Sequence, residues 1–157
     1  MKLQHAAVAA CLAALLSSHS ALAADTSSVP AGLKFAVVRA HIADDNWKGA
    51  IEELQRLNEP TSADWNNLMG YSLRKAKTPD YEAAEKFYDA ALRIDPTHRG
   101  ALEYSGELYL MLGNLPKAEE RLAALDKACR LPCSEYTDLK KAVAAYKANG
   151  NKYVATP

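Results

Sequence analysis

The 157-residue sequence has no excess of charge of either sign. Lysine plus arginine and aspartate plus glutamate number 19 each, so the formal net charge is +0 when the histidines are neutral. Binding to nucleic acid or to an anionic membrane surface depends largely on a basic excess. We therefore expect no nucleic acid among the partners of this chain.

Long apolar stretches are also missing. The apolar run Ala6–Leu16 has 11 residues, whereas a helix that crosses a bilayer needs about 20. We expect no permanent membrane span. Since this run follows Lys2 and precedes the small residues of Ala21–Ala23, we interpret residues 1–23 as a secretory signal peptide. Cleavage near Ala23/Ala24 would release a periplasmic protein.

Cysteine is scarce, with three in the whole sequence. Cys11 follows Val8-Ala9-Ala10, which resembles the lipobox of a lipoprotein, but the apolar run continues beyond it to Leu16. After cleavage only Cys129 and Cys133 are left, four positions apart. In an exported protein such a pair predicts a disulfide bond, with a redox-active pair or a soft-metal site as alternatives.

Groups that could perform catalysis are few. The mature chain keeps two histidines, His41 and His98, and neither belongs to a zinc-protease, nucleophile-elbow or phosphate-loop signature. The glycines do not follow a predicted strand at a phosphate-binding spacing, and we predict no strands at all. We therefore expect no enzyme activity, no catalytic residue, no metal site and no cofactor.

What the sequence does contain is a period of 34 residues. Three columns of residues recur at this spacing, and each keeps apolar residues on one helical face. The columns are Ala50, Ala84 and Ala118; Leu54, Tyr88 and Leu122; and Leu57, Ala91 and Leu125.

The central stretch, Tyr81–Pro96, has small residues at 84 and 91, an aromatic residue at 88 and a proline at 96. This spacing resembles the second helix of a tetratricopeptide repeat. The resemblance implies an all-α fold, a right-handed α-solenoid of three helix pairs plus a C-terminal capping helix, with seven helices in total. In that family a small residue on the first helix, here Gly70, lets the partner helix approach closely.

The expected repeats cover about 31–62, 63–98 and 99–132, followed by a capping helix at 134–148. A flexible lead at 24–30 precedes them, and a loose tail at 149–157 follows. We expect Asn46, Ser62 and Ser134 to cap helices, and prolines to set helix boundaries. The turn Lys77–Asp80 carries two residues more than the equivalent turn of the third repeat.

The resemblance also implies a function, which is to bind a protein or peptide in the groove formed by the first helices of the repeats. It gives an adaptor of the cell envelope, with a partner and an oligomeric state that the sequence does not specify. Alternatives are a small redox or metal-handling protein that uses Cys129 and Cys133, and a lipoprotein assembly factor that is processed at Cys11.

First-helix positions i, i+4 and i+7 share one face and would form the wall of this groove. The wall would be basic and aromatic in its N-terminal half and acidic in its C-terminal half. The family's clamp for a terminal carboxylate is not predicted, because Asn67 alone of its residues is present. The expected wall residues are Phe35, Arg39, Ile42, Asn67, Tyr71, Arg74, Glu103, Glu107 and Leu110.

Overall fold

The computed structural model describes residues 31–153. The signal peptide and the lead expected at 1–30 lie outside the described residues, as do 154–157 of the tail. Within 31–153 all regular structure is helical. The helices are α1 (Ala31–Lys34), α2 (Ala36–Ala43), α3 (Trp47–Leu57), α4 (Ala63–Lys75), α5 (Tyr81–Ile94), α6 (Arg99–Met111), α7 (Leu115–Ala128) and α8 (Ser134–Ala148).

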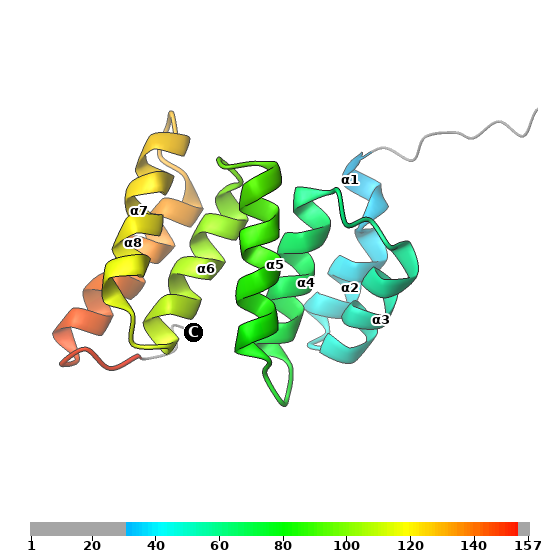
Figure 1. The fold of residues 1–157 in the computed structure, drawn as a ribbon, viewed down its shortest axis with the longest axis horizontal. Coiled ribbons are helices and arrows are strands. Elements are labelled where there is room, and N and C mark those ends of the chain that lie inside the picture. Colours follow the sequence, from blue (N-terminus) through cyan, green and yellow to red (C-terminus); the bar gives the residue numbers. More distant parts are fainter. Residues whose placement is uncertain (1–30, 154–157) are drawn as a thin grey trace, which may run out of the picture.

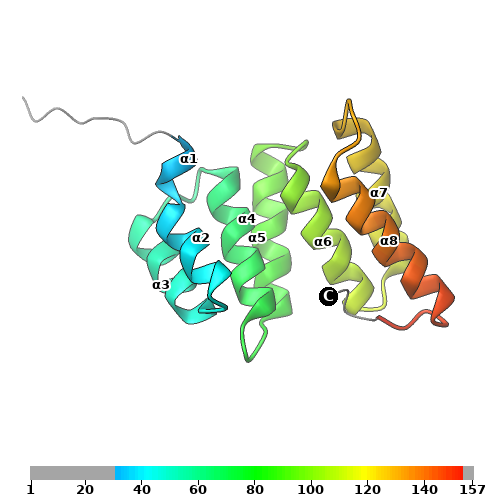
Figure 2. The same cartoon turned by 180° about the vertical axis from the view of Figure 1, so that it is seen from behind.

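The helices stack as antiparallel pairs in chain order. Helix α2 pairs with α3, α4 with α5 and α6 with α7, and α8 packs on α6 and α7 at the C-terminal end (Figure 1). Figure 2 shows the opposite side, where the first helices α2, α4, α6 and α8 lie in front. The predicted all-α solenoid with a capping helix is therefore confirmed.

The first predicted helix differs from expectation, because it is divided into α1 and α2. The break lies at Phe35, whose φ of −107° and ψ of 20° precede α2 without a side-chain cap. The Phe35 side chain is 2% exposed and packs into the core. The structure thus contains eight helical segments between residues 31 and 153, where seven helices were predicted for the chain.

The second helix of each pair begins in the same way. Asn46, Asp80 and Asn114 are the N-cap residues of α3, α5 and α7, and they are spaced by 34 residues. Each side-chain oxygen accepts a hydrogen bond from the backbone N–H three residues later, at distances of 3.1, 2.9 and 3.2 Å. These caps satisfy backbone donors that a helix start leaves unpaired.

The turn between α4 and α5 carries the predicted insertion. It contains five residues, Ala76–Asp80, whereas the turn between α6 and α7 contains three, Leu112–Asn114. The backbone N–H of Asp80 donates to the Leu73 carbonyl at 3.2 Å and closes the longer turn. The extra residues therefore enlarge a loop without disturbing the helix stack.

Some predicted helix boundaries were wrong. Helix α8 starts at Ser134 itself, with Cys133 as an N-cap that makes no side-chain cap bond. The Ser134 hydroxyl instead donates to Glu135 at 3.2 Å. Pro96 precedes α6 in a turn rather than lying in its first turn, and α7 ends at Ala128, before it reaches Pro132. The Ser62 cap of α4 is confirmed, since its hydroxyl accepts from the Trp65 N–H at 3.3 Å.

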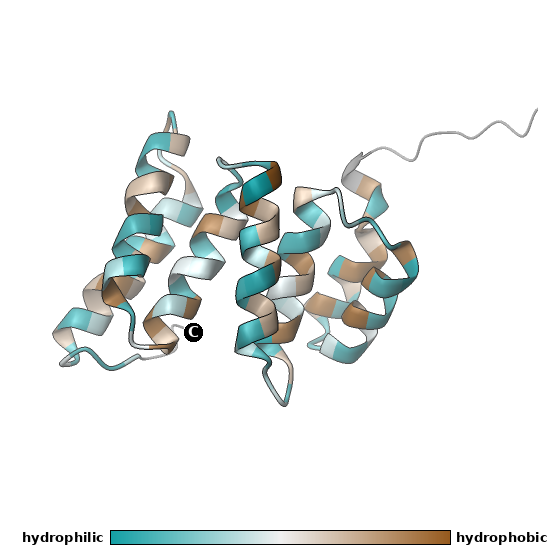
Figure 3. Cartoon of the chain, viewed as in Figure 1, coloured by the Kyte–Doolittle hydropathy of each residue, from teal (hydrophilic) through white to brown (hydrophobic). Residues whose placement is uncertain are grey.

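The core holds the predicted columns of apolar residues. Ala84, Tyr88 and Ala91 are fully buried where α4 and α6 meet α5. A Cβ atom added to Gly70 would lie 2.9 Å from the Tyr88 ring and 3.1 Å from the Ala84 carbonyl. The expected role of Gly70 in close helix packing is therefore confirmed. Figure 3 shows that hydrophobic and hydrophilic residues share most of the helices, as expected when each helix has one buried side.

Candidate functional site

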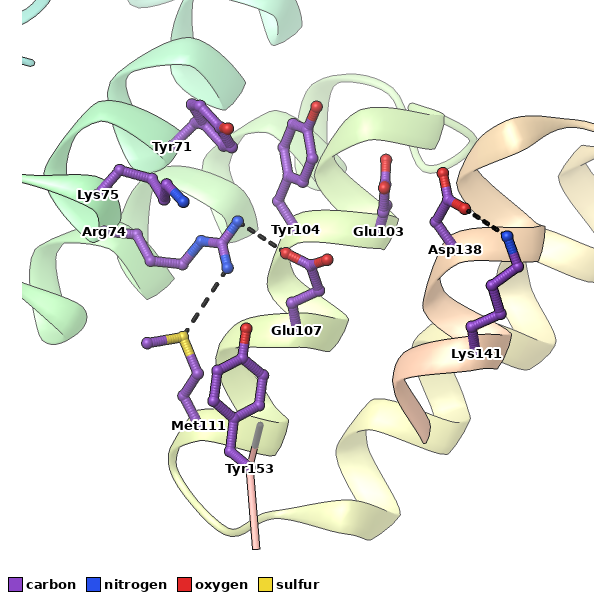
Figure 4. Close-up of a pocket in the computed structure, with 10 residues that line it drawn as sticks. All are labelled: Tyr71, Arg74, Lys75, Glu103, Tyr104, Glu107, Met111, Asp138, Lys141 and Tyr153. Atoms are coloured by element: carbon purple, nitrogen blue, oxygen red, sulfur yellow. Dashed lines mark hydrogen bonds and ion pairs between the residues drawn. The ribbon is translucent and has the colours of Figure 1, made fainter. Parts of the chain in front are cut away.

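The main candidate site is a cleft of about 660 Å³ on the side of the solenoid formed by the first helices. Side chains from α4, α6 and α8 line it, together with one residue from the segment after α8 (Figure 4). Acidic, basic and tyrosine side chains are present in equal numbers, with one methionine. The lining residues are Tyr71, Arg74, Lys75, Glu103, Tyr104, Glu107, Met111, Asp138, Lys141 and Tyr153.

Four of the predicted wall residues meet in this cleft, namely Tyr71 and Arg74 from α4 and Glu103 and Glu107 from α6. Three other predicted residues do not line it. Phe35 lies in the core, Asn67 is 7% exposed beside Gly100, and Arg39 lies over the Phe35 ring at 6.0 Å from its centroid. The secondary positions Ile42 and Leu110 pack with the core as well.

Arg74 joins the second helix pair to the third. Its side chain is 4% exposed, and its guanidinium forms an ion pair with Glu107 at 2.8 Å. A second guanidinium nitrogen lies 3.8 Å from the Met111 sulfur. Burial disfavours its charge, but the nearby Tyr88 and Glu107 outweigh this effect and raise the pKa of Arg74. Arg74 is thus a fixed cation that Glu107 already neutralises.

Tyrosine rings surround this ion pair. The Tyr71 and Tyr104 rings are tilted against each other, with centroids 4.6 Å apart, and Trp47 meets Tyr71 edge-on at 5.8 Å. The Arg74 guanidinium lies 5.5 Å from the Tyr71 centroid and 5.6 Å from the Tyr104 centroid, within range of cation–π attraction. Burial raises the pKa of Tyr104 to about 12. These rings therefore stay neutral at physiological pH.

Glu103 lies one helical turn before Glu107 and has a different environment. Burial raises the pKa of Glu103 to about 8, and the charge of Glu107 contributes further to the rise. Asp138 and Glu135 from α8 act in the same direction, whereas Arg74 acts against it. Figure 4 shows Glu103 and Asp138 directed into the space between α6 and α8. This carboxyl group is thus poised to lose its proton when a cation approaches.

The sequence interpretation missed the contribution of the C-terminal end. Asp138 and Lys141 belong to α8, where they form an ion pair at 3.4 Å. Asp138 follows Glu103 by 35 residues, so extending the first-helix positions by one more repeat would have indicated it. Tyr153 belongs to the tail predicted to be loose, yet it is half-buried and packs against the C-terminal core cluster. The described part of the tail, up to residue 153, therefore forms one wall of the cleft.

The two cysteines of the mature chain lie at the other end of α8. Their sulfur atoms are 1.98 Å apart, the distance of a disulfide bond, and their Cα atoms are 6.0 Å apart. Among residues 31–153, no three histidine, cysteine, aspartate or glutamate side chains come together as a metal-ion site. In the same part of the chain, no helix is both long and apolar enough to span a membrane.

The two histidines of the mature chain have structural contacts. His98 is the N-cap of α6, and its Nδ1 accepts a hydrogen bond from the Ala101 N–H at 3.0 Å. Because Nδ1 is an acceptor here, the proton of the neutral ring is on Nε2, which donates to Asp64 at 3.0 Å. His41 contacts the Asn46 amide at 3.1 Å. The cleft itself contains no histidine.

Comparison with known proteins agrees with this architecture. Residues 77–148 match the sequence model of a family described as tetratricopeptide repeat. The matched region runs from the turn before α5 to the end of α8 and so includes most of the cleft. Repeats of this kind generally mediate interactions between proteins. No curated protein gives a significant match to the chain.

Proposed function

Because residues 77–148 identify this chain as a tetratricopeptide-repeat protein, we propose that it is a non-enzymatic adaptor of the cell envelope. Its partner is a protein or peptide, which binds in the cleft between α4, α6 and α8. Members of this family typically act as scaffolds rather than enzymes. The proposal therefore needs a binding surface and no catalytic group.

The observation that carries this proposal is the composition of the cleft. It is lined by first helices of consecutive repeats, and its walls combine half-buried tyrosine rings with charged groups. Tyrosine and arginine are over-represented among the residues that dominate binding energy in protein interfaces. Tyr71 and Tyr104 are held in place by each other and by Trp47, so little conformational entropy is lost when a partner covers them.

Export from the cytoplasm is the second part of the proposal. The segment 1–23 has the pattern of a signal peptide, and a sulfur pair at bonding distance is compatible with an oxidising compartment. We expect N-terminal sequencing of the protein purified from its native envelope to begin at or near Ala24. A chain that starts at Met1, or that carries a lipid on Cys11, would contradict this localisation.

Partner binding is tested by removing cleft side chains that the fold does not need. The variant Tyr71→Ala with Asp138→Ala alters the wall on both sides, while Arg74 stays in place because it is buried and paired. We expect this variant to lose most capture of the native partner from an envelope extract, with little change in melting temperature. The matched control is Lys86→Ala with Glu120→Ala, on the exposed surface of α5 and α7. Capture that survives in the folded cleft variant would contradict the proposal.

A further inference from the structure

The charges of the cleft are paired with one exception. Glu107 is paired with Arg74 at 2.8 Å, and Asp138 with Lys141 at 3.4 Å. The remaining cation, Lys75, lies over the Trp47 ring, 6.0 Å from its centroid. Glu103 makes no ion pair and no hydrogen bond with any residue between 31 and 153. The cleft therefore contains one carboxyl group that is partly removed from water and has no cationic partner.

The same cleft shows which group suits this chemistry. The guanidinium of Arg74 lies beside the rings of Tyr71 and Tyr104 and pairs with Glu107. A planar guanidinium can stack on an aromatic face and pair with a carboxylate at the same time, whereas an ammonium is a more strongly hydrated point charge. Glu103 repeats this arrangement one turn earlier on α6, beside the Tyr104 ring, but without an arginine.

We propose that Glu103, Tyr104 and Asp138 form a subsite that binds the side chain of an arginine from the partner. This inference rests on the proposed function, because the arginine belongs to the protein or peptide in the cleft. Glu103 pairs with the guanidinium, Tyr104 supplies a ring face, and Asp138 adds negative charge from α8 (Figure 4). Binding draws α6 and α8 together through a shared cation.

Electrostatics favour a cation at this point over an anion. Three carboxylates face Glu103, since Glu107 lies on the same helix and Asp138 and Glu135 lie on α8. Arg74 on α4 is the cation that acts on it, and that charge is already paired with Glu107. The partner of Glu135, Arg99, is 3.7 Å away and more than half exposed. An incoming guanidinium thus relieves repulsion among four carboxyl groups, whereas an anion would add to it.

The test uses two small probes that differ in charge but hardly in shape, N-acetyl-arginine amide and N-acetyl-citrulline amide. Each is titrated into the full mature chain and followed by NMR. We expect the arginine probe to shift the signals of Glu103, Tyr104 and Asp138 in a saturable way, and the citrulline probe to leave them unchanged. Glu103→Gln should weaken binding of the arginine probe by about fivefold or more, whereas the control Glu120→Gln should bind like the native chain.

The pH dependence gives a second readout. The arginine probe should bind more tightly above about pH 8, where Glu103 is ionised, than near pH 6. This difference should disappear in Glu103→Gln. Equal binding of both probes, unchanged affinity in the folded Glu103→Gln chain, or shifts confined to residues outside the cleft would overturn the inference.

Failure of the subsite and failure of the proposed function can be told apart. If Tyr71→Ala with Asp138→Ala abolishes partner capture while Glu103→Gln leaves it unchanged, the cleft binds its partner without an arginine at Glu103. If Glu103→Gln loses the arginine probe but neither variant affects capture, the subsite exists and the partner binds elsewhere. The first result overturns the subsite as a partner site, and the second overturns the proposed function.

Discussion

The two junctions between consecutive helix pairs are built from different side chains. Between the first and second pairs, Phe35, Val38 and Leu54 form an apolar cluster with Trp65 and Met69. Between the second and third pairs, charged and polar groups cross the boundary. These crossings are Asp64–His98 at 3.0 Å, Arg74–Glu107 at 2.8 Å, Glu85–Lys117 at 3.2 Å and Asp89–Arg121 at 3.0 Å, together with the hydroxyl of Tyr109, which donates to Glu85 at 3.0 Å.

This difference separates stability from binding. An apolar junction gains free energy in proportion to the area that it removes from water, whereas exposed ion pairs gain little. Three of the four ion pairs at the second junction include a side chain that is about 40% or more exposed. The fourth, Arg74–Glu107, is buried and lies at the cleft. We infer that the first junction stabilises the solenoid, while the second positions the groups that meet a partner.

The largest effect should come from the first junction, through Trp65→Ala. The indole ring is 7% exposed, its N–H donates to the Leu54 carbonyl at 2.7 Å, and the ring meets Phe87 edge-on at 5.8 Å. Truncation leaves a cavity and a buried carbonyl without its donor. We expect a loss of about 3–5 kcal/mol in the free energy of unfolding, measured by urea denaturation.

The control for this variant is Lys86→Ala on the exposed side of α5, which should change stability by about 0.5 kcal/mol or less. A loss below about 1 kcal/mol in Trp65→Ala would mean that the apolar junction does not carry the stability of the stack. The comparison between the junctions would then be wrong.

The second prediction concerns the buried ion pair of the polar junction. Glu107→Gln keeps the shape of the side chain but leaves Arg74 as a buried cation without a counter-charge. We expect a loss of about 2–3 kcal/mol in the free energy of unfolding. The double variant Arg74→Met with Glu107→Leu removes both charges, so it should be more stable than the single variant. A double variant that is less stable than Glu107→Gln would show that the ion pair itself stabilises the junction.

The sequence allowed the second helices to be predicted better than the cleft. Their register follows from buried small residues such as Ala84 and Ala118, because a larger side chain would not fit between the helices. Gly70 could be interpreted in the same way. The cap residues Asn46, Asp80 and Asn114 formed another column at the same spacing, but the sequence interpretation assigned capping only to the first of them.

The cleft could be predicted only in part, since its residues depend on contacts across repeats. Phe35 was placed in the wall by a spacing that assumes a continuous helix, and the break before α2 lets its side chain enter the core instead. Arg74 was expected to face a partner, but Glu107, 33 residues later, makes its burial tolerable. Tyr153 follows the last helix and belongs to no repeat column, so periodicity could not place it.

The smallest predicted effect concerns the stability contributed by Glu103 and its dependence on pH. Burial and neighbouring carboxylates raise the pKa of this residue from its ordinary value of 4.5 to about 8. The folded chain thus holds a proton that the unfolded chain releases, and stability falls as pH rises between these two values. Glutamine cannot ionise, so Glu103→Gln should match the native chain near pH 4 and exceed its stability near pH 9. Because the group is partly exposed, solvent screening limits the gain to an order of 1–2 kcal/mol. Melting temperatures of both chains at these two pH values test this, with Glu120→Gln as the exposed control. An equal difference at both pH values would show that Glu103 is ionised throughout the range, and its repulsive surroundings would then have no measurable effect on folding.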